Sequence, residues 1–99
     1  MNFTVYVRRS AKVEITEAQT WYETQQSGLG LEFLSALAQV IDRLAETPLI
    51  YQLAHRNVRR AIVRRFPYFV WYRVEERTVT ILACTHFKQH NEPTQIPRK

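Results

Sequence analysis

The segment Asn57–Val74, with the sequence NVRRAIVRRFPYFVWYRV, contains two strand-like runs that meet at Phe66-Pro67-Tyr68. Within it, Phe69–Tyr72 is apolar at consecutive positions, which is typical of a central strand covered on both faces. Proline has no backbone N–H to give to a sheet, so Pro67 marks the turn between the runs. The segment therefore predicts a pair of adjacent strands in an antiparallel sheet.

The same segment concentrates arginines without a nearby carboxylate, because no Asp or Glu occurs between Glu46 and Glu75. Like charges on neighbouring strand positions repel each other. A negatively charged partner would relieve this repulsion: phosphate, nucleic acid or a carboxylate-rich protein surface. The alternative is a solvated sheet face, partly paired with carboxylates from the first half of the chain. The candidate target-binding residues are Arg59, Arg60, Arg64, Arg65 and Arg73.

The first half of the chain predicts a strand followed by two helices. Asn2–Arg8 alternates apolar and polar residues, as a strand does. Ser10 offers an N-cap oxygen for an amphipathic helix that runs to about Gln26. Gly28 suits a left-handed residue at the helix end. A second amphipathic helix is expected over Leu31–Glu46, and so short a connection makes the two helices an antiparallel hairpin.

After a loop at residues 47–56, the period of the pattern changes to two. We expect strands over Val58–Phe66, Tyr68–Val74 and Arg77–His86, then a tail or short cap over Phe87–Lys99. The fold class is therefore α+β with the order β-α-α-β-β-β. It is a mainly antiparallel sheet with a helical hairpin packed on one face, in a single domain of residues 1–99.

Composition indicates a small folded chain with its positive charge in the second half. The 99 residues are 45% hydrophobic and 12% aromatic, which argues against disorder. Residues 1–46 hold four Lys/Arg and six Asp/Glu, whereas residues 47–99 hold ten Lys/Arg and three Asp/Glu, so the balances are −2 and +7. The second half therefore predicts a basic face or groove.

Cys84 is the only cysteine, which excludes an internal disulfide and fits a reducing compartment. It lies in the apolar run TVTILAC, where a buried thiol is usual, although His86 is close enough in sequence to act as a base for it. The histidines show no metal-ligand spacing with Cys84, so we expect no cofactor. Because no signal-peptide or membrane-length pattern occurs, we expect a cytoplasmic protein without membrane contact.

Short motifs follow one another in a fixed order across nearly the whole chain. Their aromatic residues Trp21, Tyr22, Phe33 and Tyr51 are interpreted first as packing residues. The motifs are Trp21-Tyr22-Glu23, Gly28-Leu29-Gly30 with Phe33, Leu44 with Pro48 and Tyr51, Val58-Arg59-Arg60, Arg65-Phe66-Pro67-Tyr68, Tyr72-Arg73-Val74, and Leu82-Ala83-Cys84-Thr85-His86 with Pro93 beyond.

In order and spacing these motifs resemble the RelE/ParE superfamily of toxins from bacterial type II toxin–antitoxin systems. The resemblance implies growth inhibition and plasmid stabilisation, and a cognate antitoxin as partner. RelE-like members are implied to cut messenger RNA on the ribosome. Where they carry two arginines and a tyrosine, this chain has Phe69, Lys88 and about Thr94. In a ribonuclease, the catalytic groups would then have to come from His86, Lys88 and His90.

ParE-like members are instead implied to inhibit DNA gyrase by binding. Arg65-Phe66-Pro67-Tyr68 and His86 resemble that branch better, whereas the tail Phe87–Pro93 lacks the Arg-rich segment of many of its members. Three hypotheses stay open: a gyrase-binding toxin, a ribosome-dependent endoribonuclease, and a non-toxic antitoxin-binding module. All three imply the same partner, an acidic antitoxin segment that folds along the hairpin and the sheet edge in a hetero-oligomer.

Overall fold

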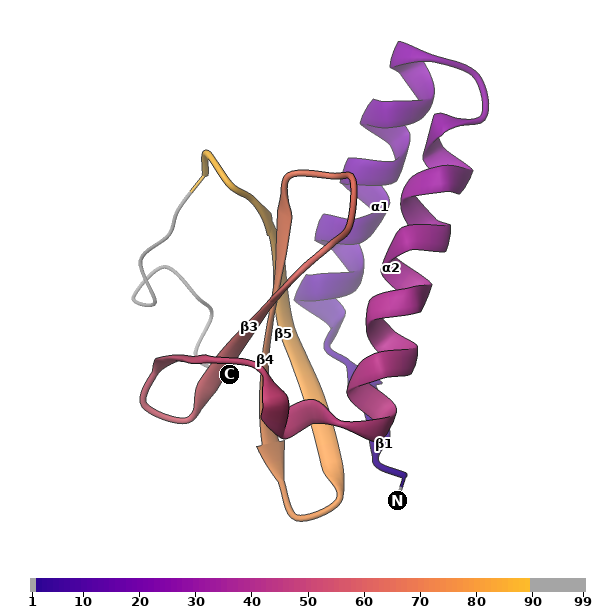
Figure 1. Ribbon diagram of the computed structural model, residues 1–99. Helices are drawn as coiled ribbons and strands as arrows, with labels where there is room; N and C mark the ends of the chain where they lie inside the picture. The colour runs from indigo at the N-terminus through magenta and orange to yellow at the C-terminus, as the bar shows by residue number, and fades with distance from the viewer. Residues whose placement is uncertain (1, 90–99) are drawn as a thin grey trace.

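The computed structural model describes residues 2–89 as a five-stranded sheet with a helical hairpin covering one face (Figure 1). The expected α+β class and the order of strand, two helices and further strands are confirmed. One additional short strand lies in the segment that was expected to be a loop. The elements are β1 (Thr4–Val7), α1 (Arg9–Gln25), α2 (Leu29–Glu46), the 3-10 helix η1 (Pro48–Ile50), β2 (Leu53–His55), β3 (Val58–Ile62), β4 (Tyr68–Glu75) and β5 (Thr78–His86).

The sheet has the strand order β1-β5-β4-β3-β2, so β4 lies at its centre. β1 pairs with β5 in parallel, and the other neighbours are antiparallel. The parallel pairing covers only Thr78–Ile81 of β5. Beyond Ile81, the edge of β5 is therefore not covered by β1.

One carboxylate closes the connection between α1 and α2. Glu23 accepts backbone N–H bonds from Gly28 and Gly30, each 3.0 Å long. These N–H groups lie at the start of α2, where helix donors have no intrahelical partner. Gly28 has φ +90°, which confirms its expected left-handed conformation. A Cβ on Gly30 would lie 2.9 Å from the carbonyl oxygen of Gln19, so this close approach of the helices requires glycine.

The hydrogen bonds to Glu23 make the stability of the fold depend on pH. They hold the pKa of the Glu23 carboxyl below its usual value of 4.5. A depressed folded pKa contributes stability above the unfolded pKa, and this contribution is lost as pH falls through the folded value. We expect Glu23→Gln to lower the free energy of unfolding at neutral pH, and the deficit relative to the native chain to shrink below about pH 4.5.

Urea unfolding at a series of pH values checks this expectation. Glu46→Gln is the matched control, because it makes the same chemical change at the exposed end of α2. A deficit of Glu23→Gln that stays constant down to pH 3 would contradict the role given to the carboxylate.

The inner layer of the core lies between the hairpin and the sheet and is rich in aromatic rings. The ring centroids of Tyr22 and Phe33 are 5.4 Å apart, and Phe66 meets them edge-on at 4.9 and 5.3 Å. The Tyr72 hydroxyl donates a 2.6 Å hydrogen bond to the carbonyl of Pro48, which ties η1 to the sheet. The other buried members are Ala11, Ala18, Ala36, Leu37, Val40, Leu44, Ala61, Val63, Val70, Val79, Ile81 and Cys84.

The opposite face of the sheet carries a second, smaller apolar layer, which we call the outer cluster. Side chains alternate along β4, so residues 69 and 71 face this layer while residues 68, 70 and 72 face the helices. All of residues 69–72 are buried, which confirms the prediction of a central strand covered on both faces. The outer cluster consists of Phe69, Trp71, Leu82 and Ala83, with Ala54, Val58 and Phe87 packed against them.

The strand expected over Val58–Phe66 ends earlier, at Ile62. The reason is a tight turn: the Val63 N–H donates a 3.0 Å hydrogen bond to the carbonyl of Tyr68. Within that turn Arg65 has φ +70°, a conformation that no strand can contain. The alternation of apolar residues continues through this turn, and for that reason the pattern alone extended the strand too far.

Other boundaries also differ from the expectation. The segment 47–56 contains η1 and β2, which is paired with β3. α1 begins at Arg9, so Ser10 lies inside the helix, where its Oγ is buried without a hydrogen-bond partner, and is not the N-cap. α2 begins at Leu29, two residues before the expected start. The expected tail, Phe87–Lys99, lies outside the described residues from His90 onward.

Candidate functional site

Among the candidate target-binding residues, Arg59 is committed to the fold. Its Nη1 donates hydrogen bonds to the carbonyls of Tyr51 and Leu49, at 2.6 and 3.3 Å. These bonds fasten the segment between η1 and β2 to β3. Because its guanidinium is hydrogen-bonded to carbonyls of its own chain, Arg59 contributes charge to the basic half but is poorly placed to bind a partner.

Arg60 and Arg73 lie on the outer face of the sheet. The Arg60 guanidinium carbon is 4.3 Å from the ring centroid of Phe69 and 5.5 Å from that of Trp71. An arginine stacked on aromatic rings keeps the N–H groups at its edge available for an anion. Arg73 is held by a carboxylate instead, with its Nε 3.6 Å from Glu75. The outer face thus offers one stacked, accessible cation.

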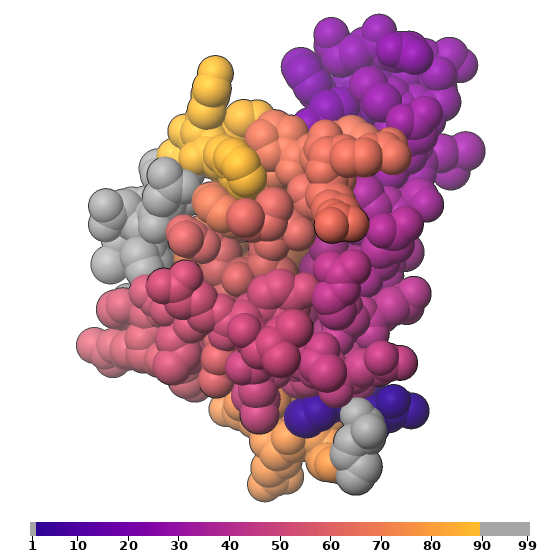
Figure 2. Space-filling model, viewed as in Figure 1, coloured from indigo at the N-terminus to yellow at the C-terminus, as the bar shows by residue number. Residues whose placement is uncertain are grey.

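Arg64 and Arg65 lie in the turn between β3 and β4, which rests against α2 (Figure 2). Arg65 Nη2 is 3.3 Å from a carboxylate oxygen of Glu32 on α2. A depression of about 600 Å³ lies here, lined also by Ser35 and Gln39. The five arginines expected as one surface therefore lie at three places: the inner side of β3, the outer face, and this turn.

Of the residues proposed for a ribonuclease, His86 and Lys88 lie within the described residues, next to each other at the end of β5. Phe69 occupies a position where a RelE-like ribonuclease would need a cation. Its side chain is buried in the outer cluster, with its ring centroid 4.4 Å from that of Phe87. His86 belongs to the opposite side, where its ring meets Tyr68 edge-on at 5.2 Å. The His86 Nδ1 accepts a 2.9 Å hydrogen bond from the backbone N–H of Lys88. Lys88 itself is exposed. His90 lies outside the described residues.

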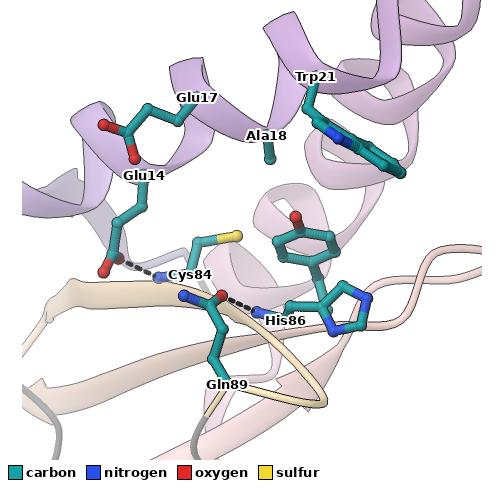
Figure 3. Close-up of a pocket in the computed structure, with 8 residues that line it drawn as sticks. Glu14, Glu17, Ala18, Trp21, Cys84, His86 and Gln89 are labelled. Carbon is teal, nitrogen blue, oxygen red and sulfur yellow. Dashed lines mark hydrogen bonds between the residues drawn. The ribbon is translucent and has the colours of Figure 1, made fainter. Parts of the chain in front are cut away.

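A hollow of about 320 Å³ lies between α1 and the uncovered edge of β5 (Figure 3). We call it the α1 hollow. In Figure 3 the carboxylates of Glu14 and Glu17 lie at one end, and Trp21 and His86 lie at the other. Glu14 Oε1 accepts a 2.8 Å hydrogen bond from the backbone N–H of Cys84, which attaches α1 to β5. Tyr68 and Gln89 also line the hollow.

Burial dominates the electrostatics of the α1 hollow. It raises the pKa of the Glu14 carboxyl, a rise that the Cys84 N–H opposes and the nearby Glu17 charge reinforces. Burial likewise raises the pKa of the Tyr68 hydroxyl to about 12. It also raises the pKa of the Cys84 thiol to about 12, helped by Glu14. A thiol with such a pKa stays protonated at neutral pH, so this cysteine is inert as a nucleophile.

Sequence reasoning missed most of the α1 hollow. Glu14, Glu17 and Trp21 are spaced three and four residues apart, so they share one stripe of α1. That spacing was visible, but nothing in it says that β5 lies beside the stripe. Trp21 is 56% exposed and so is not a core residue, although its ring meets that of Tyr22 edge-on at 5.1 Å. Tyr22 and Phe33 are buried in the core as expected.

No group of His, Cys, Asp and Glu side chains among residues 2–89 is arranged to hold a metal ion. Neither described helix is long and apolar enough to cross a membrane.

Comparisons with known proteins relate the chain to toxin–antitoxin systems. The family model for the ParE toxin of the type II system parDE matches residues 5–90. A chain of the chromosomal ParDE system from P. aeruginosa has a similar fold, with a TM-score of 0.76 and 15% identity over 85% of this chain and 95% of that one.

A chain of the RelBE2 toxin–antitoxin complex from Mycobacterium tuberculosis gives a TM-score of 0.65 and 22% identity, over 87% and 99%. No curated protein sequence matches significantly. At these identities, the structural likenesses establish the fold alone.

Proposed function

Because this chain belongs to the ParE toxin family of type II toxin–antitoxin systems, we propose that it arrests bacterial growth by binding DNA gyrase. A cognate antitoxin would neutralise it, as the neighbouring solved complexes each pair a toxin with an antitoxin. Both gyrase and the alternative target, the ribosome, lie in the cytoplasm, which is the compartment that the proposal requires. The proposal needs no cofactor.

The single observation that carries the choice of gyrase is the filled outer face of the sheet. Cleavage of RNA by its 2′-hydroxyl needs a base beside the nucleophile and a cation beside the developing charge. Here the face carries the buried rings of Phe69 and Trp71, with Arg60 above them. The candidate base His86 lines the α1 hollow on the other side. Binding needs no such alignment, so this arrangement favours a toxin that acts by contact.

The contact surface for the target is proposed to contain Arg60, Arg64, Arg65 and Arg73. Arg59 leaves this set because its guanidinium binds carbonyls of its own chain. The side chains of Arg64 and Arg65 are exposed in the β3–β4 turn. The planar guanidinium of arginine binds a carboxylate or phosphate through paired N–H groups, which suits a protein that must hold an acidic target.

The test is controlled expression of the chain with and without the acidic protein encoded beside its gene. We expect growth arrest by the chain alone and full rescue by the neighbour. Primer extension on ribosome-bound messages from arrested cells should show uncut RNA. Purified chain should inhibit the supercoiling of relaxed plasmid by gyrase. The purified complex with the antitoxin should not.

Each contrary result selects another function. Codon-positioned cuts that disappear in the His86→Ala variant would establish the ribonuclease instead, because that histidine is the candidate base within the described residues. Normal growth under strong induction of folded protein that still binds its neighbour would leave a non-toxic antitoxin-binding module.

A further inference from the structure

The α1 hollow is a negatively charged place on a positively charged protein. The chain has a formal net charge of +5, yet Glu14 and Glu17 both face the hollow. Neither carboxylate forms an ion pair with a lysine or arginine of residues 2–89, where the paired carboxylates are Glu32 and Glu75. One oxygen of Glu14 is engaged by the Cys84 N–H. The other has no hydrogen-bond partner among the described residues, and the Glu14 side chain is half-buried, so this oxygen is open to a cation that enters the hollow.

The two ends of the α1 hollow suit different parts of one ligand. The carboxylate end favours a guanidinium or ammonium group. The walls toward the other end are the Tyr68 ring and the exposed indole of Trp21, which suit a chain of methylene groups. A bare inorganic cation would use only the first end. An arginine or lysine side chain uses both, and a hollow of about 320 Å³ has room for it.

The surroundings of the α1 hollow suit a side chain that arrives on a peptide. Beyond Ile81 the edge of β5 is not covered by β1. On this edge the backbone N–H of Cys84 donates to Glu14 Oε1, and that of His86 donates to Gln89 Oε1 at 2.6 Å. Side-chain oxygens thus stand where the carbonyls of a neighbouring strand would stand. An extended segment lying along this edge passes over the hollow.

We propose that the α1 hollow receives one arginine or lysine side chain of the antitoxin segment that lies along the edge of β5. The antitoxin is chosen over the target because the proposed target surface lies on the outer face and the β3–β4 turn, whereas the hollow lies between α1 and β5. An acidic antitoxin is attracted by the basic surface of the toxin but can slide along it. A cation placed in this acidic hollow fixes the register of the segment. The inference rests on the proposed function for the existence of the antitoxin.

The experiment uses the full chain and the full-length acidic protein encoded beside its gene. In the variant Glu14→Gln/Glu17→Gln both charges are removed while shape and the acceptor for Cys84 are kept. We expect the Kd, measured by calorimetry, to rise at least about tenfold, because a buried charge loses its partner. Growth arrest by the variant alone should persist. The control Asp42→Asn/Glu46→Gln makes the same change of charge on exposed positions of α2 and should leave the Kd within about twofold.

The second arm locates the partner side chain. Each lysine and arginine of the antitoxin is replaced by glutamine in turn, and its Kd is measured against the native toxin and against Glu14→Gln/Glu17→Gln. One replacement should raise the Kd about tenfold with native toxin and by less than about twofold with the variant, which is the signature of a direct pair. Thermal unfolding of the variant separates loss of fold from loss of contact.

Several outcomes would overturn the inference. An equal loss with the α2 control would mean that only net charge matters. Independent effects for every basic residue of the antitoxin would mean that no cation enters the hollow. Loss of toxicity with unchanged affinity for the antitoxin would mean that the hollow binds the target and not the antitoxin. If the native toxin does not bind the acidic protein encoded beside its gene, the proposed function fails together with the inference. Binding without loss in the variant overturns the inference alone.

Discussion

Replacing Trp71 by alanine is expected to lower the free energy of unfolding by about 3–5 kcal/mol, the usual cost of removing a large buried aromatic side chain. Trp71 is 1% exposed at the centre of the outer cluster. Its Nε1 donates a 2.8 Å hydrogen bond to the Thr85 hydroxyl, and its ring meets that of Phe69 at 5.6 Å. Alanine would leave a cavity and remove the partner of the Thr85 oxygen.

Urea unfolding followed by circular dichroism measures this loss, and the chain offers a matched control. Trp21→Ala makes the same chemical change at an indole that is 56% exposed. It should shift the free energy of unfolding by less than about 1 kcal/mol, as surface substitutions usually do. Trp71→Phe is a milder companion in case the alanine variant does not fold. It keeps a ring and should cost mainly the hydrogen bond, about 1 kcal/mol.

A Trp71→Ala variant that is as stable as the native chain but no longer toxic would contradict the packing of the outer cluster. The ring would then be a surface that contacts the target. The stability measurement therefore also tests the observation that carries the proposed function, because the argument against RNA cleavage depends on a filled outer face.

The fold was predictable where a single period governs a long segment. The apolar stripe of α2 and the doubly apolar run at residues 69–72 each admit one reading, and the structure bears both out. β2 could not be predicted, because its three residues carry too little pattern and its pairing with β3 is irregular. The true end of β3 depends on the left-handed Arg65, which a sequence of alternating residues does not reveal.

For the candidate site, the sequence predicted only the excess of positive charge in the second half of the chain. Counting arginines identified a basic half, but not that Arg59 binds carbonyls of its own chain while Arg60 stacks on rings. These roles depend on which neighbour each face meets. The α1 hollow was beyond sequence reasoning for the same reason. Glu14 looks like a solvated helix residue until β5, 70 positions later, brings the Cys84 N–H to it.

Reversing the charge of Arg60 and Arg64 together is expected to abolish toxicity. Arg60 is the accessible cation of the outer face, and Arg64 is exposed in the β3–β4 turn, with no ion pair among the described residues. A hydrogen bond to a charged group contributes about 1.5–3 kcal/mol, so losing two contacts should weaken gyrase binding at least about hundredfold. Repulsion between the new glutamates and an acidic target adds to this loss.

The measurements are growth under induction and inhibition of gyrase supercoiling by purified Arg60→Glu/Arg64→Glu protein. The control is Arg9→Glu/Lys12→Glu, which changes net charge equally at exposed positions of α1. Long-range attraction is weakened in both variants, but contacts with the target are lost only in the first. We therefore expect the control to arrest growth and to inhibit gyrase at physiological ionic strength, where long-range attraction is largely screened. An equal loss of toxicity in both variants would mean that the arginines act only through the net charge of the protein and not through contacts with the target. Full toxicity of Arg60→Glu/Arg64→Glu would move the target-binding surface away from the sheet and its turn.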